Sequence, residues 1–136
     1  MQKKWIYLAG TLLLVMTAGW LYYLYQQPRK NVVGQDAEYE LTAVELYNAF
    51  EKNEAGATAK YVDKILVVTG TIKEISETAE HLIIKLIAGN DNGGINAELD
   101  KENKNEKMFS GNIIKIKGRC TGFLSDVYLV DCIIEN

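Results

Sequence analysis

The feature that most constrains this chain is an uncharged stretch of 21 residues that runs from Trp5 to Tyr25. Seventeen of these residues are hydrophobic. An α-helix of this length spans about 32 Å, which matches the ~30 Å hydrocarbon core of a bilayer. Tryptophan and tyrosine lie at both ends, as is typical of side chains at a membrane interface. The sequence therefore predicts a transmembrane helix at residues 5–25, behind a short basic N-terminus at residues 1–4.

The alternative for this stretch is a cleaved signal peptide, whose apolar region is usually about 7–15 residues and so shorter than this one. Positive charge gives the expected orientation. Lys3, Lys4 and the terminal amine precede the helix, whereas Arg29 and Lys30 follow it, and this slight excess favours a cytoplasmic N-terminus. We therefore expect a single-pass membrane protein whose C-terminal domain is extracytoplasmic.

Residues 31–136 have the composition of a globular domain. Hydrophobic residues fill 47 of these 106 positions, which argues against disorder. The segment has 11 Lys and Arg residues against 18 Asp and Glu residues, a formal charge of −7, and this excess argues against a basic nucleic-acid binder. The only proline, Pro28, lies where no periodicity is sustained. This predicts a linker at residues 26–40 and a domain at residues 41–136.

The domain begins with the signals of a helix. Thr42 is a good N-cap, and Glu45 three residues later completes a capping box. Apolar residues then recur at helical spacing as far as Tyr61, and Gly56 is a point where this segment could divide into two helices.

After Lys64 the sequence becomes rich in β-branched residues and alternates between apolar and polar positions. Gly70 and Gly118 lie inside two of the resulting strands, where glycine often marks a bulge or a bend at a barrel corner. The charged segment 100–107 is expected to be a short helix or a loop. The predicted fold class is mainly β (α+β): a five-stranded OB-fold-type barrel preceded by a helix, behind one N-terminal transmembrane helix. The strands are expected at residues 65–72, 81–87, 95–99, 112–120 and 126–134.

Several short motifs recur in order along the domain. They are Leu46-Tyr47, Asn53-Glu54, Lys60-Tyr61, Lys64, Val68-Thr69-Gly70-Thr71-Ile72, Lys117-Gly118-Arg119-Cys120-Thr121-Gly122, Asp126-Val127 and Asp131-Cys132. Together they resemble the tRNA_anti-like family of small bacterial OB-fold domains, which commonly follow a membrane or lipoprotein anchor. The resemblance covers residues 42–134 and implies no established activity. One departure is Ala97, where many relatives are expected to carry another cysteine.

Nucleic-acid binding is the first function that an OB fold suggests, because such folds hold single strands on aromatic side chains of the second and third strands. The segments 81–87 and 95–99 contain no Phe, Tyr or Trp. The one basic cluster, at Lys115, Lys117 and Arg119, is interpreted as the solvated face of a strand. With the acidic excess, these observations predict no nucleic-acid partner.

No motif for catalysis, a cofactor or a metal emerges, so we expect a protein that is not an enzyme. His81 is the only histidine and is interpreted as a surface or half-buried residue at the start of a strand. Asn90, Asp91 and Asn92 offer oxygen atoms, but the rest of a calcium loop is missing, so they predict a hairpin turn. The acidic side chains at Asp100, Glu102 and Glu106 alternate with lysines, which indicates a solvated surface.

The two cysteines leave two alternatives open. Cys120 and Cys132 lie in successive predicted strands, where they form either a disulfide, which an extracytoplasmic location allows, or two buried free thiols. Strand alternation places Cys132 on the same face as Tyr128 and Val130. Direct pairing of the cysteines requires a hairpin register centred on Asp126.

The function most consistent with these features is a membrane-tethered binding module of the cell envelope that engages a protein, peptide or glycan partner. One alternative is an accessory subunit that assembles with other membrane proteins through the apolar helix, where Ala9, Gly10, Ala18 and Gly19 offer small packing surfaces. A more distant alternative is a nucleic-acid-binding OB domain.

Overall fold

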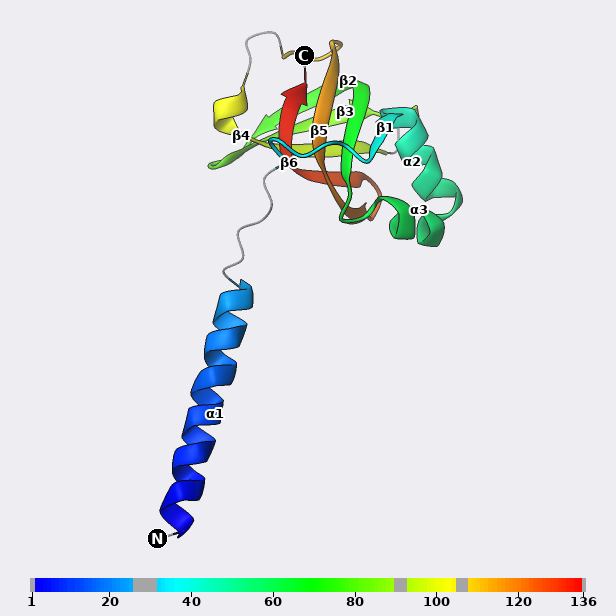
Figure 1. Ribbon diagram of the computed structural model, residues 1–136. Coiled ribbons are helices and arrows are strands. Elements are labelled where there is room, and N and C mark those ends of the chain that lie inside the picture. Colours follow the sequence, from blue (N-terminus) through cyan, green and yellow to red (C-terminus); the bar gives the residue numbers. More distant parts are fainter. Residues whose placement is uncertain (1, 26–31, 90–92, 105–107, 136) are drawn as a thin grey trace. The chain divides into compact units, whose positions relative to one another are not determined.

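The computed structural model describes residues 2–25, 32–89, 93–104 and 108–135 (Figure 1). The chain falls into two units, Met1–Lys30 and Asn31–Asn136. The first contains one helix, α1 (Gln2–Tyr25). Over the described residues, no helix combines the length and the apolarity needed to cross a membrane, so the transmembrane segment predicted at residues 5–25 is not confirmed. Pro28 and the first part of the predicted linker lie outside the described residues.

The second unit has two short helices followed by a sheet. All five predicted strands are present, each within a few residues of its expected bounds. The helical segment divides at Asn53, whose side-chain oxygen accepts a hydrogen bond from the backbone of Gly56 at 3.1 Å. The elements are β1 (Tyr39–Thr42), α2 (Ala43–Lys52), α3 (Glu54–Tyr61), β2 (Ile65–Glu77), β3 (His81–Ile87), β4 (Gly94–Asp100), the 3₁₀ helix η1 (Lys101–Asn103), β5 (Ile113–Phe123) and β6 (Val127–Glu135).

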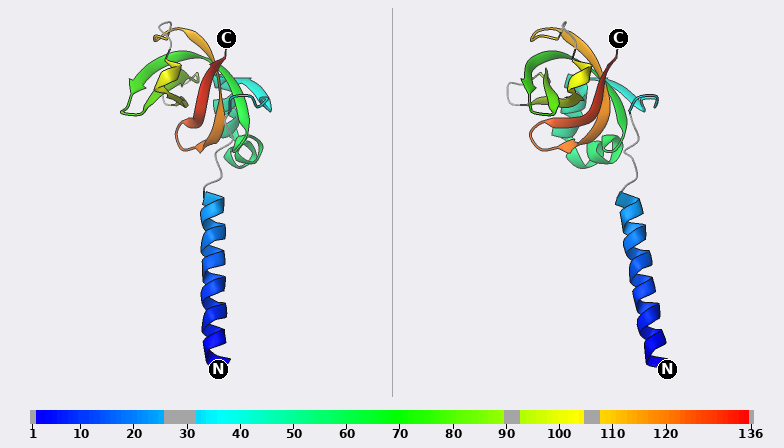
Figure 2. Two further views of the ribbon diagram at one scale, coloured as in Figure 1. Left: turned by 60° about the vertical axis from the view of Figure 1, so that its left-hand side comes forward. Right: turned by 90° about the vertical axis from the view of Figure 1, so that its left-hand side faces the viewer.

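Strands β2 to β6 form a closed mixed barrel with the topology of an OB fold. The strand order is β1-β2-β3-β4-β6-β5, and a further pairing of β2 with β5 closes the sheet on itself (Figure 2). β4 and β6 run parallel, whereas the other pairs within the barrel are antiparallel. β1 adds a short parallel strand to the outer edge of β2. The sequence did not predict β1, because its four residues lie in the segment assigned to the linker and the helix start.

The helix start follows the predicted capping box. The Thr42 hydroxyl accepts a hydrogen bond from the Glu45 backbone at 3.2 Å, and the Glu45 carboxylate accepts one from the Thr42 backbone at 2.8 Å. α2 then packs its buried residues Leu46, Tyr47 and Phe50 into the core of the barrel.

Strand alternation decides which side chains reach the outer surface. On β3 the buried positions are Leu82, Ile84 and Leu86, and on β4 they include Ala97 and Leu99. The intervening side chains of both strands therefore point away from the core, and these make up the surface described next.

Both strand glycines lie where another side chain comes close. Gly118 lies at a register shift between β5 and β6 at which the extra residue is on β6, and a Cβ atom at Gly118 would overlap Cys132 Sγ. Gly70, by contrast, lies in an uninterrupted run of pairs between β2 and β5. A Cβ atom at Gly70 would lie 2.8 Å from the Cβ of Ala43 and 3.2 Å from Leu86. This glycine therefore permits a close approach of α2 to the sheet, and of the two predicted features, a bulge or a bend, the pairs with β5 show no bulge at Gly70.

Candidate ligand-binding face

The outward side chains of β3, β4 and β6 form one continuous surface, which we call the β3–β4–β6 face. Lys85 pairs with Asn96, and Asn96 pairs in turn with Tyr128, so these three residues lie side by side across the strands. Ile83 likewise pairs with Glu98. The face consists of His81, Ile83, Lys85, Asn96, Glu98, Tyr128 and Val130.

Tyr128 lies between two hollows. One, of about 330 Å³, is lined by residues 121–124 of the β5–β6 hairpin and by Tyr128. The other, of about 260 Å³, is lined by Ile83, Asn96, Glu98, Tyr128, Leu129 and Val130. Because Tyr128 is 39% exposed, its ring is open to a ligand that enters either hollow.

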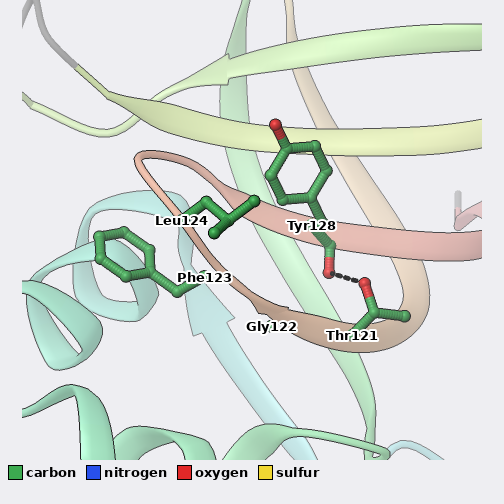
Figure 3. Close-up of a pocket in the computed structure, with 5 residues that line it drawn as sticks. All are labelled: Thr121, Gly122, Phe123, Leu124 and Tyr128. Carbon is green, nitrogen blue, oxygen red and sulfur yellow. Dashed lines mark hydrogen bonds between the residues drawn. The ribbon is translucent and has the colours of Figure 1, made fainter.

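The hairpin holds the Tyr128 backbone in place (Figure 3). The Thr121 hydroxyl donates a hydrogen bond to the Tyr128 carbonyl at 3.3 Å. Leu124 lies beside the ring and is 84% exposed. Phe123 points the other way, and its ring centroid lies 5.5 Å from that of Phe50 on α2. The hairpin thus has one aromatic side chain in the core and one apolar side chain at the solvent.

Asp126 fixes the hairpin to β3 and β4. It is the only buried polar or charged residue of the described ranges, with 8% exposure. Its carboxylate accepts hydrogen bonds from the Gly94 backbone at 2.7 Å, from Lys85 Nζ at 2.9 Å and from Asn96 Nδ2 at 3.0 Å. Burial by itself raises the pKa of Asp126, but these donors outweigh it, so the pKa is held below its usual value.

His81 lies at one end of the face, between two carboxylates. Its Nε2 is 3.5 Å from Glu98 Oε1, and its Nδ1 is 3.6 Å from Asp100 Oδ1. This agrees with the predicted surface or half-buried position, since the side chain is 40% exposed. Glu98 and Asp100 make this end of the face acidic.

The basic cluster predicted as a solvated face is a row of ion pairs. Lys115 Nζ lies 2.8 Å from Glu40, Lys117 Nζ lies 4.0 Å from Glu135, and Arg119 Nε lies 4.0 Å from Asp131. The carboxylates come from β1 and β6, which flank these residues. The row therefore offers no excess of positive charge to a ligand.

The two cysteines are buried and are not bonded to each other. Cys120 pairs with Leu129 rather than with Cys132, because the hairpin is not centred on Asp126: Phe123 pairs with Val127. Burial raises the pKa of Cys120 to about 11 and also raises the pKa of Cys132. Neither thiol lies on the β3–β4–β6 face.

No group of three or more His, Cys, Asp or Glu side chains within the described ranges is arranged to hold a metal ion. The candidate oxygen ligands Asn90, Asp91 and Asn92 lie outside those ranges, as does Glu106. Asp100 and Glu102 line a separate hollow of about 250 Å³ with Asp131.

Sequence reasoning missed Tyr128 as a surface residue. Simple alternation puts Tyr128 and Cys132 on one face, but Asp131 has a φ of 54° and the pairing of β4 with β6 shifts there. The extra residue turns Cys132 into the core while Tyr128 faces outward. The signal that could have found Tyr128 is the OB topology itself, which places the last strand beside the third.

Three comparisons place this fold among known proteins. The family model described as tRNA_anti-like matches residues 1–134. No curated protein matches the chain. A solved structure of a lipoprotein from Klebsiella pneumoniae subsp. pneumoniae MGH 78578, proposed to bind nucleic acid, matches with 18% identity and a TM-score of 0.59, and the match covers 81% of this chain and 100% of that one. This likeness establishes the fold.

Two further solved structures match about half of the chain. The S. pombe Stn1–Ten1 complex has 16% identity and a TM-score of 0.38, over 48% of this chain and 52% of that one. A replication protein A heterotrimer bound to single-stranded DNA has 12% identity and a TM-score of 0.40, over 53% and 57%. At these TM-scores neither match carries an argument about this chain.

The prediction that the domain has no nucleic-acid partner is wrong. The fold it shares belongs to a lipoprotein proposed to bind nucleic acid. β3 and β4 lack aromatic side chains, but β6 brings Tyr128 beside Asn96. Charge is also unevenly distributed: Lys85 and Asp126 neutralise each other at 2.9 Å beside Tyr128, and the acidic side chains of the face lie at its His81 end.

Proposed function

The chain belongs to the tRNA_anti-like family, and from this premise we propose that its barrel is a binding module for short single-stranded nucleic acid. The observation that carries the proposal is the exposed Tyr128 ring, which lies between two hollows on the β3–β4–β6 face. This is the surface on which OB folds hold single strands. The nucleic-acid binding proposed for the Klebsiella lipoprotein of the same fold supports this choice.

Stacking, rather than phosphate attraction, supplies the affinity in this proposal. Lys85 is the one lysine of the face, and Asp126 already engages its ammonium group. Stacking of a base on an aromatic ring contributes about 1–3 kcal/mol. With a single ring, the complex is weak, with a dissociation constant of roughly micromolar to millimolar. Its affinity also depends little on salt, because few counterions are released from the nucleic acid.

The test is a titration of a short fluorescent single-stranded oligonucleotide with the full chain, read by anisotropy. Tyr128→Ala should weaken binding by about fivefold or more, since it removes the stacking surface. Tyr128→Phe keeps the ring and should bind as the wild type does. Phe109→Ala is the matched control, because Phe109 is an exposed aromatic residue outside this face.

Two results would overturn the proposal. One is the absence of saturable binding at millimolar protein. The other is a Tyr128→Ala variant that binds as tightly as the wild type. A steep loss of affinity with increasing salt would instead show that the protein binds mainly to the phosphates. It would contradict stacking as the source of the affinity.

A membrane location for this module is a further part of the proposal. Its support is the uncharged stretch from Trp5 to Tyr25, with tryptophan and tyrosine at both ends. A C-terminal module outside the cytoplasm is consistent with the lysines that precede this stretch.

A further inference from the structure

The hollow beside Tyr128 has polar side chains on β4 and on β6. Asn96 and Glu98 lie two residues apart on β4 and so project from the same face. Tyr128 on β6 adds its ring and its hydroxyl group, whereas Ile83, Leu129 and Val130 are apolar. A ligand that fills this hollow therefore meets the hydrogen-bonding groups of β4 beside the Tyr128 ring.

Asp126 orients the Asn96 amide. Asn96 Nδ2 donates to Asp126 Oδ2 at 3.0 Å. Asp126 is itself held by Lys85 and by the Gly94 backbone. This bond uses one of the two amide hydrogens, so Asn96 keeps its carbonyl oxygen, which accepts hydrogen bonds, and its second N–H for a ligand.

Glu98 adds a second acceptor. An ionised carboxylate has no proton to donate. Glu98 Oε1 lies 3.5 Å from His81 Nε2, and the side chain is 43% exposed, so it is open to the hollow. Glu98 is thus a group that only accepts hydrogen bonds, and it lies beside the ring on which a base would stack.

We propose that this hollow selects cytosine over thymine and uracil. The inference rests on the proposed function, since it names the base preference of the same site. Cytosine has an exocyclic amino group, which donates to a carboxylate in the way that Glu and Asp read cytosine in nucleic-acid complexes. Thymine and uracil have a carbonyl oxygen at that position, which faces Glu98 without a hydrogen bond and against its charge.

The experiment compares oligo(dC) and oligo(dT) of equal length in the anisotropy titration with the full chain. We expect oligo(dC) to bind about tenfold more tightly. Glu98→Gln should reduce this preference, because the glutamine amide can donate to the thymine oxygen. Glu98→Asp keeps an acceptor and should preserve the preference. Glu51→Gln, which removes the same charge from the exposed surface of α2, should leave it unchanged.

The outcomes separate the two proposals. If neither oligonucleotide binds, the nucleic-acid function itself fails, and the base preference fails with it. If both bind equally, or oligo(dT) binds more tightly, and Tyr128→Ala abolishes binding, then the function holds and the base preference is overturned. A preference for oligo(dC) that is unaltered in Glu98→Gln would also overturn it, because the discrimination would then come from another group.

Discussion

At the scale of the residue, Asp126 has two structural roles. Its carboxylate closes the β5–β6 hairpin onto β3 and β4, and it orients the Asn96 amide on the ligand face. A buried carboxylate without partners would destabilise the fold, whereas one with three donors stabilises it. The structure of the ligand face and the stability of the barrel therefore depend on the same charge.

Replacing Asp126 by Asn should lower the free energy of unfolding by about 1–3 kcal/mol at neutral pH, because donors on Lys85 and Gly94 lose a charged acceptor. The pH dependence follows from the lowered pKa of Asp126. The contribution is complete above the unfolded pKa near 3.8 and disappears as the pH falls through the lower folded pKa. Urea unfolding at neutral pH and at about pH 3 measures the difference.

The gap in stability between the wild type and Asp126→Asn should therefore shrink in acid. Asp36→Asn serves as the control, since Asp36 is exposed and precedes the sheet. An equal gap at both pH values would show that the carboxylate charge is not what Asp126 contributes.

Residue patterns predicted some of these features and not others. The capping box at Thr42 and Glu45 was predictable, because its geometry depends on two residues close in sequence. Asp126 and Tyr128 were not recognised, because their roles depend on β6 lying beside β4, a contact between distant segments. A positive φ at Asp131 then moved Cys132 to the other face, which alternation alone cannot reveal.

At the scale of the element, the packing of α2 on the sheet depends on the close approach of Ala43 to Gly70. Ala43 is the first residue of α2, and its methyl group occupies the space that a side chain at position 70 of β2 would need. The strands and the capped helix were predictable from periodicity, but this contact was not, since the pattern indicated only that Gly70 was unusual. β1 was missed because four residues, of which Glu40 is charged, give a weak strand signal.

Gly70→Ala should lower the free energy of unfolding by about 1–3 kcal/mol, because its new methyl group would overlap the methyl group of Ala43. Ala43→Gly removes that methyl group, so the double variant should be more stable than the sum of the two single changes predicts. Urea unfolding of all four proteins completes the cycle. If the effects of the two single changes on the free energy of unfolding are additive, Ala43 is not the neighbour that requires a glycine at position 70.

At the scale of the whole molecule, the two units raise separate questions. The barrel supplies the ligand face, and the first unit supplies the membrane location that we propose. If α1 also packs against another membrane protein, the small residues Gly10, Ala18 and Gly19 are where a neighbouring helix would approach.

The full chain should stay in the membrane fraction after a carbonate wash, and protease added to spheroplasts should degrade its C-terminal domain. Replacing Leu13 and Val15 by Lys should release the protein, because two charges in the apolar stretch oppose insertion. Release of the wild type by carbonate would reject the anchor. Protection of the domain in intact spheroplasts would reverse the orientation.

The closure of the barrel has a consequence for the order in which the domain is built. β2 pairs with β5, and β4 pairs with β6, across long intervening segments of the chain. Pairings between distant segments slow folding, because the loop must close before its contacts form. Tyr128 joins Asn96 only when the last strand docks beside β4. During synthesis, the ligand face is therefore absent from the chain until its final strand has emerged from the ribosome.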